Sequence, residues 1–169
     1  MSGDASKNGG RALRALGAAL IVAFAAWRVW TAMQAEPGVS EKAWFYDEIA
    51  RRLFVAPRGL IPPIAGIDGP GADGVRAVVV APPGRCDDAA ARRIAYLETT
   101  TPELKQVLEA AKAAGRPPEV SRGAAQAQRL VRRPEDAGWV SLVSPEGEAI
   151  VSGWATPGPD GVTPAVCSP

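Results

Sequence analysis

The sequence predicts an α+β protein in which an N-terminal transmembrane helix is followed by a small antiparallel-sheet domain with one or two packed helices. Three segments of the 169-residue chain lead to this prediction. An apolar run near the N-terminus is long enough to cross a bilayer. The stretch Val75–Ala81 holds consecutive β-branched residues, as buried strands do. Residues 101–115 carry the start and stop signals of an amphipathic helix. The expected parts are a disordered cytoplasmic tail (1–10), a transmembrane helix (11–35), a linker (36–42), an α+β extracytoplasmic domain (43–155) and a Pro/Gly-rich tail (156–169).

The apolar run has the length and the flanking charges of a membrane span. No residue from Ala15 to Trp27 is charged, and a helix continued to Met33 would measure about 28 Å, close to one hydrocarbon thickness. Basic residues precede the run and acidic residues follow it, which keeps the N-terminus cytoplasmic and exports the remainder. The residues expected at the membrane interface are Arg11, Arg14, Trp27, Arg28 and Trp30.

The apolar run has two other interpretations. A cleaved signal peptide has the same layout, and Ala23-Phe24-Ala25 matches its cleavage pattern. A soluble amphipathic helix is disfavoured because Leu16–Trp27 is apolar on every face. The anchor and the signal peptide agree that residues from about 36 onward are exported.

The stretch "AWFYDEIARRLFVAP" begins the exported part. Its two ends, 44–46 and 53–55, are rich in aromatic and β-branched residues, which favour strands. We expect a hairpin here, with a helix over 47–53 as the competing interpretation. Prolines and the loop "GIDGPGADG" then separate the hairpin from the buried strand Val75–Ala81.

In the second half of the chain, the secondary structure of some segments is clear from the sequence and that of others is ambiguous. Residues 90–100 fit a strand or a helix. Thr101 as N-cap and Pro102 at the first helical position predict a helix over 101–114. The apolar stripe that we expect to pack on the sheet consists of Leu104, Val107, Leu108 and Ala111. "QRLVRR" and "WVSLV", joined by "PEDAG", predict a strand pair, and "SPEGEAIVSGW" predicts either a short helix capped by Ser144 or a turn into a last strand.

The composition excludes several kinds of chemistry. There is no histidine, so a Ser-His-Asp triad cannot form, and two cysteines alone cannot build a structural zinc site. No phosphate-binding loop is present, and 19 basic against 18 acidic residues create no field for nucleic acid. We therefore expect no metal, no cofactor and no nucleic-acid partner.

Two pairs of carboxylates and one group of arginines remain as candidates. Asp47 with Glu48, and Asp87 with Asp88, are available for acid/base work but fit solvated turns and helix caps better. A basic patch would suit anionic headgroups or an acidic protein, although a solvated, mixed-charge face is the simpler interpretation. The patch would consist of Arg116, Arg122, Arg129, Arg132 and Arg133, with Arg92 and Arg93 as further members.

Cys86 and Cys167 are the only cysteines. An even count in an exported domain is typical of a disulfide, and a bond here would hold down a proline-rich tail. Two unpaired thiols are the alternative.

The succession "WFYD", "LFVAP", "IPPI", "GVRAVV", "YLE", "TPE" and "SPEGEAI" resembles single-pass bacterial envelope proteins whose activity is uncharacterised, over about residues 44–150. The resemblance implies an anchor and a small exported domain, and it gives no catalytic residues to carry over. The expected role is a non-enzymatic, membrane-tethered interaction or structural domain of an envelope assembly. It would sit in the inner membrane as a single-pass protein, with its C-terminal domain in the periplasm and with lipid and a protein as partners. A small exported enzyme that uses carboxylates is the alternative.

Overall fold

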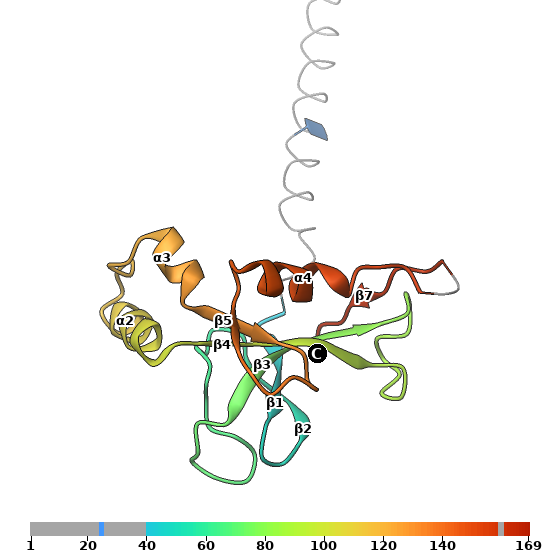
Figure 1. Ribbon diagram of the computed structural model, residues 1–169, viewed down its shortest axis with the longest axis horizontal. Coiled ribbons are helices and arrows are strands. Elements are labelled where there is room, and N and C mark those ends of the chain that lie inside the picture. Colours follow the sequence, from blue (N-terminus) through green and yellow to red (C-terminus); the bar gives the residue numbers. More distant parts are fainter. Residues whose placement is uncertain (1–23, 26–39, 159–160) are drawn as a thin grey trace, which may run out of the picture. The chain divides into compact units, whose positions relative to one another are not determined.

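The computed structural model of the protein describes residues 24–25, 40–158 and 161–169. The chain forms two compact units, Met1–Val39 and Ser40–Pro169. In the first unit the described residues are Phe24 and Ala25, which are helical. The second unit is a small antiparallel-sheet domain with few helices (Figure 1).

The predicted fold class is wrong in its transmembrane component. Among the described residues, no helix combines the length and the apolar character that crossing a membrane requires. The longest helix of the second unit has 12 residues, or about 18 Å, against a hydrocarbon core of about 30 Å. Apart from Phe24 and Ala25, the predicted 11–35 span lies outside the described residues, as do the five predicted interface residues.

All strands of the sheet pair antiparallel, in the order β2-β1-β3-β4-β5-β6, and β7 pairs with β3. Because β4 runs along one edge of β3, both β1 and β7 lie on the other edge. There β1 covers residues 74–76 of β3, and β7 covers 80–81. The strands are β1 (Lys42–Asp47), β2 (Arg52–Pro57), β3 (Gly74–Ala81), β4 (Arg93–Thr100), β5 (Arg129–Arg132), β6 (Val140–Ser141) and β7 (Ala165–Val166).

Three helices accompany the sheet: α2 (Pro102–Ala113), α3 (Arg122–Ala127) and α4 (Pro145–Gly153). In Figure 1, α2 and α3 lie at one end of the sheet and β7 at the other. Thr101 caps α2 by accepting the Leu104 N–H at 3.3 Å, and Ser144 caps α4 by accepting the Gly147 N–H at 3.0 Å. The predicted hairpin, the buried strand, the 101–114 helix and the β5–β6 pair are confirmed. The two ambiguous segments resolve as β4 and α4.

The core lies on both faces of the sheet. One face buries Val75, Ala77 and Leu97, with Cys167 packed over them. The opposite face buries Tyr96 and Val131 beneath Ile150 of α4, in a separate cluster. A sheet covered on both faces needs apolar residues at consecutive positions, which explains the near-continuous apolar run of β3.

The helix α2 packs differently from the prediction. Leu104 and Ala111 are buried, but Val107 is 37% exposed and Leu104 belongs to neither sheet cluster. The lysines of α2 instead bind the segment between β2 and β3: Lys105 donates to the Pro63 carbonyl and Lys112 to that of Gly59. The helix α2 therefore covers the proline-rich segment between β2 and β3, and its buried apolar stripe is narrower than the sequence suggested.

Candidate functional site

A pair of opposite charges lies in the middle of the α4 face of the sheet. Arg76 of β3 is the register partner of Glu98 of β4 and of Phe45 of β1. Its guanidinium lies 5.6 Å from the centre of the Phe45 ring. One terminal nitrogen, Nη2, donates to the backbone carbonyls of Arg58 at 2.5 Å and Leu60 at 3.1 Å. Arg76 thus ties the segment after β2 onto the sheet.

A cavity of about 130 Å³ opens beside this pair. It is smaller than the roughly 300 Å³ at which ligand pockets usually begin, and is close to the size that admits a benzene-sized group. Its walls are Leu60, Ile61, Pro62, Arg76, Glu98, Thr99, Thr100, Leu108, Arg129, Leu130, Val131 and Leu142. The cavity therefore suits one side chain or a very small molecule.

The described charged side chains that line the cavity do not include a pair of carboxylates. Burial lowers the pKa of Arg76 from its ordinary value, and Glu98 opposes this effect. Burial, with a smaller contribution from Glu98, raises the pKa of Tyr96 to about 12. Among the described residues that line the cavity, Glu98 is the only carboxylate. A mechanism that needs two carboxylates would have only that of Glu98 at this cavity.

Asp47 is the most enclosed acidic residue of the described chain. Its Oδ1 accepts the N–H groups of Ile49 at 3.0 Å and Ala50 at 2.6 Å, and its Oδ2 accepts that of Ile67 at 2.6 Å. These N–H groups, first that of Ala50 and then that of Ile67, lower the pKa of Asp47 from its ordinary value. One carboxylate therefore fastens the β1–β2 turn to the 64–74 loop.

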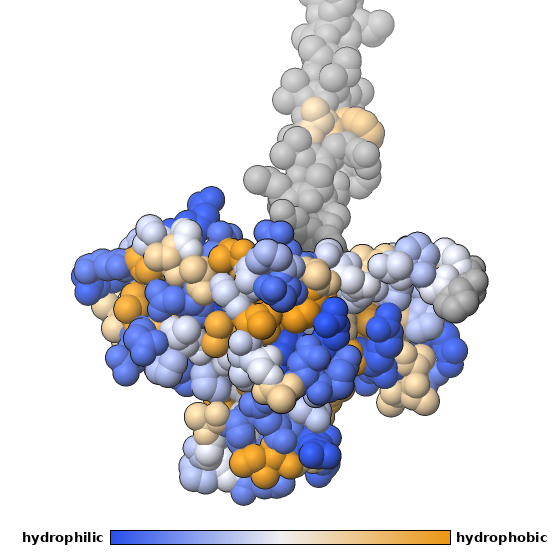
Figure 2. All heavy atoms as spheres, in the orientation of Figure 1, coloured by the Kyte–Doolittle hydropathy of each residue, from blue (hydrophilic) through white to orange (hydrophobic). Residues whose placement is uncertain are grey.

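The two fastened loops expose apolar side chains. Ile49 is 76% exposed and Ile67 is 40% exposed, while Val55 of β2 is 42% exposed. Figure 2 shows the orange apolar area at the projecting end of the hairpin region, with blue hydrophilic residues around it. Arg51 and Arg52 are exposed beside it. We call these five residues the hairpin surface.

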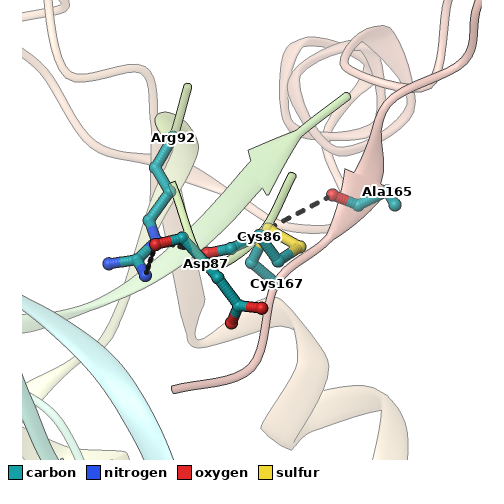
Figure 3. Close-up of a disulfide and its surroundings, with 5 residues drawn as sticks. All are labelled: Cys86, Asp87, Arg92, Ala165 and Cys167. Atoms are coloured by element: carbon teal, nitrogen blue, oxygen red, sulfur yellow. Dashed lines mark hydrogen bonds between the residues drawn. A yellow bond between two sulfur atoms is a disulfide. The ribbon is translucent and has the colours of Figure 1, made fainter. Parts of the chain in front are cut away.

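The predicted disulfide between Cys86 and Cys167 is present, with its Cα atoms 5.3 Å apart and 81 positions apart in sequence (Figure 3). The Cys167 N–H donates to the Val79 carbonyl at 2.8 Å, which continues the β3–β7 pairing. Arg92 donates to the Cys86 carbonyl at 2.6 Å, and its guanidinium stacks over Trp44 at 5.1 Å. The bond thus joins the loop after β3 to the segment that follows β7.

Three of the four candidate carboxylates make polar contacts within the domain. Asp47 holds backbone N–H groups, whereas its neighbour Glu48 forms an ion pair with Arg132. Asp88 binds the Ala90 N–H and the Arg85 side chain, and both interactions lower its pKa, the Arg85 bond more strongly. Asp87 and Asp88 lie in the loop after β3, as the simpler interpretation expected, whereas Asp47 is fully buried at the end of β1 and is not the solvated residue that this interpretation expected.

Three arginines of the candidate basic patch have separate acidic partners. Arg116 pairs with Glu119 and Arg133 with Asp136. Arg132 pairs with Glu48 and stacks on Trp139, and Arg129 lines the cavity. These three ion pairs fit the mixed-charge face that was the simpler interpretation.

Sequence reasoning missed the importance of Arg76, Glu98, Ile49 and Ile67. One signal was available for Arg76, which is the single charge within the apolar strand "GVRAVVVA". Another was available for Ile49, an isoleucine within the charged run "DEIARR". Comparison of the chain with protein families, with curated proteins and with solved structures found no match.

Proposed function

We propose that residues 40–169 form a non-catalytic interaction domain that works outside the cytoplasm, as part of an envelope assembly. The hairpin surface carries this proposal. An isoleucine that is 76% exposed gains nothing from burial in the monomer, yet the turn that presents it is fixed by a fully buried carboxylate. Because the framework is already ordered, a partner that buries these side chains does not have to order the loops first, which removes part of the entropic cost of binding.

The disulfide supports the extracytoplasmic part of the proposal, since such bonds persist in oxidising compartments and are rare in the cytosol. It is built into the core, with Cys167 buried. An inner-membrane position, contact with lipid and the resemblance to bacterial envelope proteins stay predictions.

The alternative role, an enzyme that uses carboxylates, finds no comparable support. Asp47 is occupied by three backbone N–H groups, and the cavity beside Arg76 offers Glu98 alone.

Site-specific photocrosslinking in cells that produce the full chain tests the interaction. A photoreactive residue at position 49 should give a discrete crosslinked product, whereas one at position 143 should not. Val143 is the matched control because it is also apolar and 48% exposed, but lies outside the hairpin. Equal crosslinking at both positions, or none at position 49, would contradict the proposal.

A second experiment tests the compartment. Thiol alkylation in intact cells, before and after reduction, should label Cys86 and Cys167 only after reduction. Immediate labelling of both thiols in native cells would place the domain in a reducing compartment and would contradict the extracytoplasmic assignment.

A further inference from the structure

The strand β2 ends the sheet, and its outer edge is open. Its inner edge pairs with β1 along its whole length, from Lys42 opposite Pro57 to Asp47 opposite Arg52. On the outer side, no strand pairs with β2 among the described residues, and the open part of the edge is Leu53–Val55, because Pro57 has no N–H and its carbonyl accepts the Leu60 N–H at 3.1 Å. An open edge presents a row of backbone N–H and C=O groups to which an extended chain can add.

The strand conformation of β2 is held by contacts within the domain, so no strand has to be added on its outer side to order it. The Phe54 ring packs 5.8 Å from the Phe45 ring, centre to centre, on one face. Asp47 fixes the turn that leads into β2, where Arg51 takes a positive φ of 51°. A partner that adds to β2 therefore does not have to order the strand first, which removes part of the entropic cost of binding.

The charges around β2 favour an acidic partner. Arg51 and Arg52 stand at its start, and they form no ion pair within the described part of the chain. Arg58 follows its end. Of the two carboxylates at the β1–β2 turn, Asp47 is engaged by backbone N–H groups and Glu48 by Arg132.

A second copy of the chain is a poor occupant. Antiparallel pairing of two β2 strands about Val55, whose backbone groups face outward, would place Arg52 opposite Arg58 of the second copy, so that like charges meet at both ends. It would also place Leu53 opposite Pro57 at two places, and Pro57 has no N–H to donate.

We propose that β2 is the docking edge for an extended segment of another protein, one that pairs with β2 as an added strand and carries acidic residues opposite Arg51 and Arg52. An aliphatic side chain of that segment would pack against Val55, which is 42% exposed on the strand. This inference rests on the proposed interaction function and names the partner class for the hairpin surface.

A synthetic peptide of alternating valine and threonine, with two glutamates at one end, is the probe. Titrated into the full chain, it should shift the backbone amide NMR signals of 52–57 more than those of other strands. A version with lysines in place of the glutamates should bind roughly tenfold more weakly. A version with a central proline should not bind, since proline cannot donate a backbone hydrogen bond to the strand pairing.

Variants of the chain make the test specific. The double variant R51E/R52E should exchange the preference, so that it binds the lysine peptide more tightly than the glutamate peptide; an unfolded variant would bind neither. V55E should weaken binding of the glutamate peptide, and V143E, at a valine of similar exposure, should not.

The inference is overturned if the shifts map outside β2, if the charge reversal leaves the preference unchanged, or if the 52–57 signals shift with protein concentration alone. The last outcome would identify a second copy as the occupant. If position 49 crosslinks in cells while the peptide fails to bind β2, the interaction function stands and the strand-addition inference fails. If position 49 does not crosslink, the interaction function itself fails.

Discussion

The carboxylate of Asp47 couples ionisation to the shape of the hairpin surface. Its oxygens accept N–H groups from two loops that are otherwise distant in sequence. Hydrogen bonds to the charged form stabilise that form, which is why its pKa is lowered. Protonation would remove this stabilisation and loosen both loops at once.

The D47N variant should therefore be less stable than the wild type near neutral pH, and the difference should shrink in acid. A lowered pKa means that the contribution is fully present above the ordinary value of 3.8 and is lost as the pH falls through the folded-state pKa. Urea unfolding of both proteins near neutral pH and near pH 3 measures this. A constant difference across that range would show that the charge of Asp47 does not act as described.

Gly66 lies where these loops meet. A Cβ at this position would collide with the carboxylates of Asp47 and Asp73. We expect G66A to cost about 1–3 kcal/mol of unfolding free energy, as overpacked sites do. G69A is the control, because a Cβ there would have no neighbour within 4 Å. Equal unfolding midpoints for the two variants would refute the close contact at position 66.

At the scale of elements, segments whose own residues carry helix-cap or strand signals could be predicted from the sequence. Segments whose conformation depends on pairing with residues far away in the sequence could not. The cap and proline of α2 and the β-branched run of β3 specify their structures locally. The segment 93–100 is ambiguous by itself and becomes β4 because it pairs with both β3 and β5. The short helix α3 has no buried residue, so no apolar stripe revealed it. Only the sheet register brings Arg76 beside Glu98, and that register cannot be read from either strand alone.

The narrow buried stripe of α2 leads to a contrast between two of its residues. L104A should lower the unfolding free energy by about 2–4 kcal/mol, because Leu104 is 1% exposed. V107A should change it by less than about 1 kcal/mol, because Val107 is 37% exposed. Urea unfolding compares them directly. Similar losses would show that α2 buries the broader stripe that the sequence suggested.

At the scale of the whole molecule, the disulfide constrains the largest part of the domain. It joins residues 81 positions apart, so in chain-entropy terms it contributes up to about 4.5 kcal/mol. The double variant C86S/C167S should lose a large share of this stability, and reduction of the wild type should reproduce the loss. An unchanged urea midpoint in both cases would show that the pairing of β7 with β3 holds the segment without the bond.

The position of β7 has a consequence for biosynthesis. Residues 79–81 of β3 are covered by a strand and a cysteine that the ribosome adds only at positions 165–167. A growing chain therefore carries Cys86 as a lone thiol through the synthesis of the following strands and helices. Until Cys167 follows it into the same compartment, that thiol is open to wrong partners, including the same cysteine of a neighbouring nascent chain. Closure of the Cys86–Cys167 bond is thus the last step in the maturation of this domain, and a chain that stalls before position 167 keeps a thiol that can form an intermolecular disulfide.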